Sequence, residues 1–164
     1  DALGSVAHDY DVILIDCPPS LGLLTVNALT AATGVLVPLQ CEFFAMEGLS
    51  QLLGTLDRVQ ATRNRSLSLL GILLTMFDRR NRLSFQVDKE IRGYFGPVVF
   101  DTRIPRNVRL SESPSFGKPA ILYDVAAAGT RAYLDLAQEV LGRLHGTEEP
   151  ASDAPSITPN EVTS

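Results

Sequence analysis

The sequence has too few cysteines and no apolar stretch long enough to make it a disulfide-rich, zinc-binding or membrane-spanning protein. Its two cysteines, Cys17 and Cys41, cannot form a disulfide framework or a four-ligand metal site. No apolar stretch approaches the roughly 20 residues that a membrane-spanning helix needs, and no basic, apolar leader opens the chain. With 164 residues, 45% of them hydrophobic, the chain can bury the core of one ordinary domain. We therefore expect a cytoplasmic protein without a membrane partner.

Basic residues are missing from the first third of the chain. Residues 1–57 contain seven acids and no lysine or arginine, whereas residues 58–109 contain eleven basic residues, ten of them arginine, and four acids. The net charge of −5 thus combines an acidic start, a basic block and an acidic end. A basic block can form a binding face even when the whole chain is acidic, so the net charge does not exclude a nucleic-acid partner.

Strand patterns alternate with helical patterns along most of the chain. The predicted strands cover residues 11–16, 35–39, 69–75 and 98–104, and the predicted helices cover 21–33, 45–62, about 84–95 and 128–144. We expect Ser84 to cap the third helix. We also expect the last helix to turn Tyr133, Leu136, Ala137, Val140 and Leu141 inward. The alternation predicts right-handed βαβ units in an α/β fold, with a mostly parallel sheet between two helical layers.

The end of the chain differs from the rest. Residues 145–164 contain three prolines, four acids and no lysine or arginine. This composition predicts a disordered acidic tail, so the expected division is a folded part over residues 1–144 and a tail over 145–164.

Polar side chains follow the predicted strands where each strand ends. They are Asp16, then Gln40 and Glu42, then residues 78–82, then residues 105–109. Ligands of open parallel sheets bind outside this edge, because loops and helix N-termini meet there. Asp16, at the end of an apolar strand, has the context of a Walker-B aspartate that holds the magnesium of a nucleotide, although an aspartate there can also simply end a turn.

Four strings in order carry a resemblance to a known family. They are YDVILIDCPPSLGLLT (10–25), VPLQCEFFAMEGL (37–49), LTMFD (74–78) and IPRNVRLSESPSFGKP (104–119). Together they closely resemble the ParA family of chromosome and plasmid partitioning ATPases. The resemblance covers roughly residues 9–143. It implies a P-loop NTPase-like fold, ATP and Mg²⁺ as cofactors, an ATP-dependent homodimer that binds DNA nonspecifically on the nucleoid, and hydrolysis stimulated by a ParB-type partner.

The resemblance also implies roles for individual residues. Asp16 matches the Walker-B aspartate, a metal-binding and catalytic position, and residues 17–20 match the loop that responds to the γ-phosphate. Pro105, Arg106 and Asn107 match the turn that lies against the adenine. Arg80 and Arg109 match DNA-contacting arginines, and Arg79, Arg82 and Arg106 would enlarge that patch.

The sequence departs from the family in one respect. It contains no G-x-x-x-x-G-K-[ST] loop, and its lysines, Lys89 and Lys118, lie outside any glycine-rich turn. We therefore expect the C-terminal portion of a ParA protein, with an incomplete sheet and no ATP hydrolysis by this chain alone. One alternative is a degenerate, non-catalytic module that binds DNA or a partner. The other is a MinD-like positioning ATPase, which the acidic tail disfavours because a membrane-targeting helix would be basic and amphipathic.

Overall fold

A computed structural model describes residues 2–18 and 22–146 of the chain. Pro19 and Ser20 of the predicted switch loop and residues 147–164 of the predicted tail lie outside the described residues.

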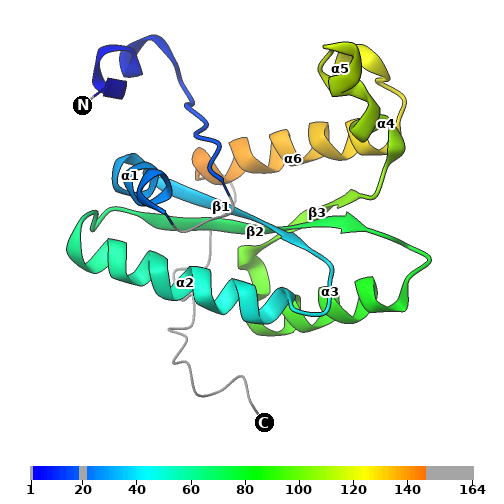
Figure 1. Cartoon of the computed structure of the whole chain (residues 1–164), viewed down its shortest axis with the longest axis horizontal. Coiled ribbons are helices and arrows are strands. Elements are labelled where there is room, and N and C mark those ends of the chain that lie inside the picture. Colours follow the sequence, from blue (N-terminus) through cyan, green and yellow to red (C-terminus); the bar gives the residue numbers. More distant parts are fainter. Residues whose placement is uncertain (1, 19–21, 147–164) are drawn as a thin grey trace.

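The fold is built around three parallel strands in the order β1 (Gly34–Gln40), β2 (Ser68–Phe77) and β3 (Val99–Pro105). The longer helices are α1 (Leu23–Ala31), α2 (Ala45–Thr62), α3 (Arg82–Phe95) and α6 (Ala128–Leu144). The short ones are α4 (Val108–Glu112) and α5 (Ala120–Tyr123), with 3-10 turns at Ala2–Ser5, Ala7–Asp9, Gly96–Val98 and Ser113–Phe116. Figure 1 shows α2 and α3 on one face of the sheet and α6 on the other. The predicted three-layer α/β fold is confirmed.

The central strand supplies both halves of the core, because successive side chains of a strand point to opposite faces. Ile72 and Leu74 pack into the cluster formed with α2 and α3, whereas Leu73, between them, packs with Phe100 and Leu136 on the α6 side. All three β2 residues are at most 3% exposed. This explains why the strand is apolar without alternation: both of its faces are covered.

The expected first strand does not form. Residues 12–18 form no regular element and pair with no strand among the described residues, and Leu14 is 87% exposed. Figure 1 shows this segment running from the N-terminal turns outside the three-stranded sheet. An apolar run becomes a strand only when neighbouring backbone satisfies its N–H and C=O groups, and no strand of the described chain lies beside this one. The prediction of a strand over residues 11–16 is therefore wrong for this structure.

The expected cap of α3 is also wrong. The helix begins at Arg82, and the cap is Asn81, whose side-chain oxygen accepts a 3.0 Å hydrogen bond from the Leu83 N–H. Ser84 lies inside the helix, 1% exposed, and its hydroxyl accepts from the Asp78 N–H at 3.3 Å. Asn and Ser are comparably good caps, so the end of the preceding turn decided which of the two residues caps α3.

The inward face of α6 differs from the expected one. Leu136 is buried, but Tyr133 and Leu141 are 48% and 45% exposed and Ala137 is exposed. The helix instead packs through Leu136 with the partly buried Val140, and it also turns Glu139 and Arg143 inward. An apolar stripe could not reveal this orientation, because the residues that fix it are charged.

Gly71 marks a close approach between β2 and α6. The β1–β2 register shifts beside it, since Val35 pairs with Leu69 and Leu36 with Gly71. A Cβ on Gly71 would meet the guanidinium of Arg143 and would lie 2.5 Å from the Phe100 ring and 2.8 Å from the Val98 carbonyl oxygen. A bulge that places a glycine here thus makes room for the Arg143 side chain.

We predict that Gly71→Ala lowers the free energy of unfolding by about 1–3 kcal/mol, the usual cost of inserting atoms into a packed core. Gly54→Ala in α2 is the control, because a Cβ there meets nothing within 4 Å. It should raise stability by about 0.5–1 kcal/mol, as alanine does in an exposed helix. Urea unfolding followed by circular dichroism measures both, and equal stabilities of the two variants would contradict the prediction.

Candidate functional site

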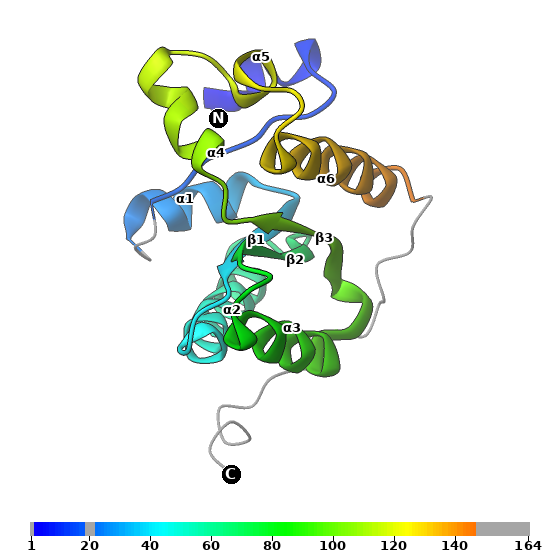
Figure 2. The same cartoon turned by 90° about the vertical axis from the view of Figure 1, so that its right-hand side faces the viewer.

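The carboxyl ends of the three strands meet at one edge of the sheet, as predicted. Gln40 pairs with Thr75 and Phe77 pairs with Pro105 at the ends of the ladders. Two further hydrogen bonds continue this alignment past the strands, from the Cys41 N–H to the Thr75 carbonyl at 3.2 Å and from the Arg106 N–H to the Phe77 carbonyl at 3.0 Å. Figure 2 views the molecule from the side on which the strands end. The predicted clusters at residues 40–42, 78–82 and 105–109 therefore share one edge.

The end of β2 leaves regular strand geometry just before this edge. Met76 has a φ of 52°, and the register with β3 shifts between Leu74 and Phe77. A positive φ is strained for a side chain of this size and persists only where the surroundings impose it. Phe77 remains buried, with its ring against Phe85 at 5.2 Å between centroids, while the chain turns toward Asp78.

The turn after β2 is held by its own hydrogen bonds. The Asp78 side chain accepts from the Arg80 N–H at 2.9 Å, and the Asp78 carbonyl accepts from the Asn81 N–H at 3.0 Å. Asn81 then caps α3. The side chains of Arg79 and Arg80 are exposed on this ordered turn, and Arg82 follows them in the first turn of the helix.

The turn after β3 is organised in a similar way. Asn107 caps α4, since its side-chain oxygen accepts from the Arg109 N–H at 2.9 Å. Pro105 ends β3, and Arg106 is exposed. The role of Pro105, Arg106 and Asn107 toward an adenine stays a prediction.

The edge arginines, defined as Arg79, Arg80, Arg82, Arg106 and Arg109, are all exposed. In the described part of the chain, the first four take part in no ion pair, whereas Arg109 contacts Glu112 at 3.1 Å and Asp124 at 3.6 Å. Four guanidinium groups without an ion pair to a described residue, on the turns after β2 and β3 and at the start of α3, favour a positive potential at this edge.

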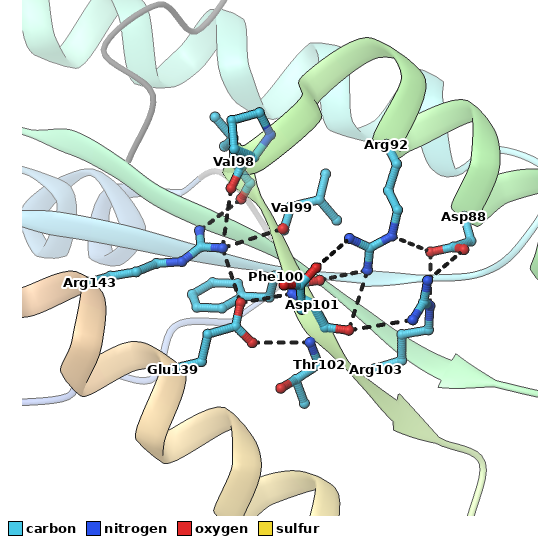
Figure 3. Close-up of polar contacts among 11 residues, drawn as sticks. Asp88, Arg92, Val98, Val99, Phe100, Asp101, Thr102, Arg103, Glu139 and Arg143 are labelled. Carbon is cyan, nitrogen blue, oxygen red and sulfur yellow. Dashed lines mark hydrogen bonds and ion pairs between the residues drawn. The ribbon is translucent and has the colours of Figure 1, made fainter. Parts of the chain in front are cut away.

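Other arginines of the basic block are used inside the fold. Asp88 of α3 accepts two 2.9 Å hydrogen bonds from Arg103 of β3 and one of 2.8 Å from Arg92 (Figure 3). Arg92 also donates to the Phe100 carbonyl at 2.7 Å. The summed charge of residues 58–109 could not separate these structural arginines from the edge arginines.

A second polar cluster, which the sequence analysis missed, fixes α6 against β3. Arg143 donates to the carbonyl oxygens of Leu70 and Val98 at 2.9 and 3.0 Å, and its guanidinium carbon lies 3.8 Å from the centre of the Phe100 ring. Glu139 accepts from the N–H groups of Asp101 and Thr102 at 2.8 and 3.0 Å (Figure 3). The two side chains pair at 3.1 Å and are 7% and 12% exposed.

These contacts act where β3 departs from regular pairing. Its register with β2 shifts between the pairs Ile72–Val99 and Leu74–Arg103, so residues 100–102 leave the ladder. Glu139 satisfies two of their N–H groups, and Arg92 satisfies the Phe100 carbonyl. The Glu139–Arg143 spacing of four residues on a helix was the one sequence signal that could have indicated this pair.

The carboxyls of this region make stability depend on pH. Burial raises the pKa of Glu139, but the hydrogen bonds from Thr102 and Asp101 and the charge of Arg143 outweigh it, so the pKa falls below its ordinary 4.5. Burial also raises the pKa of Asp88, but the hydrogen bonds from Arg103 and Arg92 outweigh this effect. The pKa of Asp88 therefore falls below its ordinary 3.8.

We therefore predict acid destabilisation. A carboxyl whose pKa is lower in the folded state stabilises the fold above its unfolded pKa, and this contribution disappears as the pH falls through the folded pKa. The urea midpoint should hold from pH 7 to about pH 5 and then decline below about pH 4.5. Glu139→Gln should have a lower midpoint at pH 7 and a shallower acid decline. A Glu139→Gln profile parallel to that of the unmodified chain would show that Glu139 does not contribute.

Among the described residues, no hydrogen bond or ion pair joins Asp16 to these edge residues. It is exposed, and its two sequence neighbours are joined by a hydrogen bond from the Cys17 thiol to the Ile15 carbonyl at 3.8 Å. Within residues 2–18 and 22–146, no group of three or more His, Cys, Asp or Glu side chains could hold a metal ion. The expected metal-binding role of Asp16 stays a prediction.

The two cysteines have different environments. Cys41 is buried at the carboxyl end of β1, and burial, with a smaller contribution from Asp88, raises its pKa to about 11. It is therefore a neutral thiol that packs as a small hydrophobic side chain. Cys17 is only partly buried.

Comparison with known proteins identifies similar chains. A family model described as an AAA domain matches residues 1–69. The chain is 59% identical over 145 residues to the chromosome partitioning protein ParA of Caulobacter vibrioides, which covers 87% of this chain and 54% of that protein. The chain thus spans about half the length of the curated relatives it matches.

Solved structures agree with the fold. Cobyrinic acid a,c-diamide synthase from Mycobacterium smegmatis, solved with an ATP analogue and magnesium, matches with a TM-score of 0.71 and 37% identity over 91% of this chain and 54% of that one. The cell division ATPase MinD of Pyrococcus furiosus matches with a TM-score of 0.68 over 85% of this chain and 55% of that one, but at 23% identity it shows the fold alone.

None of the helices in the described residues is both long and apolar enough to cross a membrane. The structural matches place the chain among P-loop NTPase-like folds, and the high identity to ParA agrees with the four strings that carried the resemblance. The chain belongs to the ParA family of chromosome-partitioning proteins.

Proposed function

We propose that this chain is part of a nucleotide-switched DNA-binding dimer that segregates chromosomal or plasmid DNA together with a ParB-type partner. The observation that carries the proposal is the set of four exposed edge arginines that make no ion pair within the described residues, on the turns after β2 and β3 and at the start of α3. The relative at 59% identity is a chromosome partitioning protein, which supports it.

The geometry suits binding to DNA without regard to sequence. Arginine on a surface turn reaches phosphate oxygens, and phosphate contacts carry no sequence information. The turn after β2 has no segment long enough to enter a groove and read base edges, because it runs only from Asp78 to Asn81 between a strand and a capped helix. Binding through such contacts releases counterions and weakens steeply as salt rises. A protein that moves along bulk chromosomal DNA on the nucleoid needs this kind of reversible contact.

The nucleotide part of the proposal needs more than this chain. Asp16 is exposed and takes part in no ion pair among the described residues, so its carboxylate is available as an oxygen ligand for Mg²⁺, which usually binds one or two carboxylates beside nucleotide phosphates. The chain contains no glycine-rich loop and lysine to hold the phosphates. We propose that a segment outside this chain supplies them, and that Pro105, Arg106 and Asn107 lie beside the base.

Bound ATP would supply the γ-phosphate whose loss on hydrolysis reverses the switch. The role of this chain is to hold the metal at Asp16 and to keep the arginine-bearing turns in place. We expect the full product of the gene to hydrolyse ATP, and this chain alone to lack that activity because it has no phosphate-binding loop.

The test compares this chain, the full product of its gene and the Asp16→Ala variant of that product. We expect the full product to bind ATP with Mg²⁺ and then to retain a nonspecific DNA duplex at low salt. Asp16→Ala should lose both, and this chain alone should bind no ATP. ATP binding by this chain that depends on Asp16 would contradict the division of roles, and a full product that never retains DNA would contradict the function.

A second candidate follows from the same missing loop. A non-catalytic module that keeps the arginine edge would bind DNA without any response to ATP. The gene sequence upstream of Asp1 separates the candidates: a K-G-G-x-G-K-[ST] loop there supports the switch, whereas a start codon with no such loop supports the module.

A further inference from the structure

Arg109 differs from the other edge arginines because it is already engaged with acidic side chains. Its Nη1 donates to Oε2 of Glu112 at 3.1 Å, and its Nε lies 3.6 Å from Oδ2 of Asp124. Glu112 is the last residue of α4, and Asp124 lies directly after α5. Two carboxylates from separate elements therefore contact one guanidinium. The oxygens of a phosphate would bind the same N–H groups of the arginine.

The two carboxylates are held in place by further contacts. The Tyr123 hydroxyl donates to the same Glu112 oxygen at 3.1 Å, and its ring stacks on Phe116 with 5.1 Å between centroids. Oδ1 of Asp124 accepts from the N–H groups of Ala126 and Ala127, both at 3.1 Å. Neither carboxylate is therefore a freely moving surface group.

The base of α4 is also fixed against α6. A Cβ on Gly129 would lie 2.5 Å from the side chain of Leu110 and 3.1 Å from Cβ of Asn107. The backbone of α6 at Gly129 therefore packs directly against the Leu110 side chain of α4. The position of Arg109 relative to Glu112 and Asp124 is thus set by the fold rather than by the ion pairs themselves.

We propose that Glu112 and Asp124 compete with the DNA phosphate for Arg109 and so weaken the affinity of the arginine edge for DNA. This inference rests on the proposed function. The contact is open to exchange, because the side chains of Arg109, Glu112 and Asp124 are 56%, 39% and 35% exposed. Exposed ion pairs contribute little to stability, so a duplex that already contacts Arg79, Arg80 and Arg82 can displace the carboxylates.

The competition has an electrostatic consequence. While the carboxylates pair with Arg109, they cancel its charge at the edge, and an approaching phosphate meets two negative groups near the guanidinium. The edge is therefore divided into four arginines that are ready to bind and one that must first exchange partners.

The test measures affinity for a nonspecific duplex by fluorescence anisotropy over a series of salt concentrations, with the full product of the gene and ATP present. Glu112→Gln and Asp124→Asn keep acceptor oxygens for Tyr123 and for the Ala126 and Ala127 N–H groups while removing the charges. We expect the double variant to bind about 3–10-fold more tightly at low salt, with a salt slope steeper by about one. Arg109→Ala should weaken binding and make the double substitution ineffective.

Two controls separate charge from structure. Tyr123→Phe removes a hydrogen bond to Glu112 without changing charge and should alter affinity less than about twofold. Glu90→Gln removes an exposed carboxylate of α3 that makes no ion pair with any described residue, and it should also have little effect.

The outcomes discriminate between the inference and the function on which it rests. Unchanged affinity in the double variant, with a clear loss in Arg109→Ala, would overturn the competition and leave the function standing. An Arg109→Ala variant with normal affinity would overturn the role of Arg109 in DNA binding itself. Equal tightening by Glu90→Gln would show that only net charge matters, which also overturns the inference.

Discussion

Replacing Arg143 with methionine should lower the free energy of unfolding by about 3–5 kcal/mol, the loss expected when one partner of a buried ion pair is removed. Methionine retains much of the apolar stem of arginine but offers no donor. Glu139 would then be buried without its charge partner, and the carbonyls of Leu70 and Val98 would each lose a hydrogen bond.

The shape of the guanidinium matters as well as its charge. Arg143 donates hydrogen bonds to four backbone carbonyls and one carboxylate. It does so through the two terminal nitrogens of its planar guanidinium group. A lysine has one nitrogen with three donors and cannot reproduce this geometry. We therefore expect Arg143→Lys to be less stable than the unmodified chain and more stable than Arg143→Met.

Arg131→Met is the matched control. Arg131 lies on the same helix, is exposed and makes no ion pair in the part of the chain that the structure describes, so its replacement should change stability by less than about 0.5 kcal/mol. Urea unfolding at pH 7, followed by circular dichroism, compares the variants. A loss below about 1 kcal/mol in Arg143→Met would mean that the cluster in Figure 3 does not hold α6 to β3.

Reversing the charge of Arg80 should weaken nonspecific DNA binding about tenfold or more at about 50 mM salt, because one phosphate contact is lost and a repulsive charge takes its place. The salt slope should become shallower by about one. ATP binding should be unchanged, since the turn that carries Arg80 is held by backbone contacts to Asp78 rather than by the Arg80 side chain.

Arg65→Glu provides the comparison for net charge. Arg65 is an exposed arginine in the turn before β2, so it lies at the opposite end of the strand from Arg80. We expect it to change affinity less than about twofold. Similar losses in both variants, measured by anisotropy with the full product of the gene and ATP, would assign the effect to net charge and would contradict a binding face at the edge.

Much of the fold could be predicted because it follows from local patterns. The apolar run at 69–75 became the core of β2, and the spacing of Leu49, Leu53 and Leu56 became the buried face of α2. Alternation of strands and helices then implied a parallel sheet, and a parallel sheet brings the ends of its strands to one edge. The common location of residues 78–82 and 105–109 needed no further information.

The failed predictions share a physical cause, which is that they depended on neighbours distant in the sequence. Residues 12–15 are as apolar as β2, but pairing requires another strand beside them, and none is present in the described chain. The face of α6 was set by Glu139 and Arg143, which meet the backbone of β3 some forty residues earlier. Periodicity records which residues are apolar, not which polar group will find a buried partner.

The sequence alone determined the family, the parallel α/β architecture and the edge where the arginines gather, because motif order and hydrophobic period are properties of the chain itself. Only the tertiary structure decided which arginines remain unpaired at that edge. Arg92 and Arg103 lie within a few ångströms of Asp88, Arg109 lies against Glu112 and Asp124, and Arg79, Arg80, Arg82 and Arg106 are in no ion pair among the described residues. Charge can be counted from a sequence, but its compensation depends on distance, and distance is set by packing.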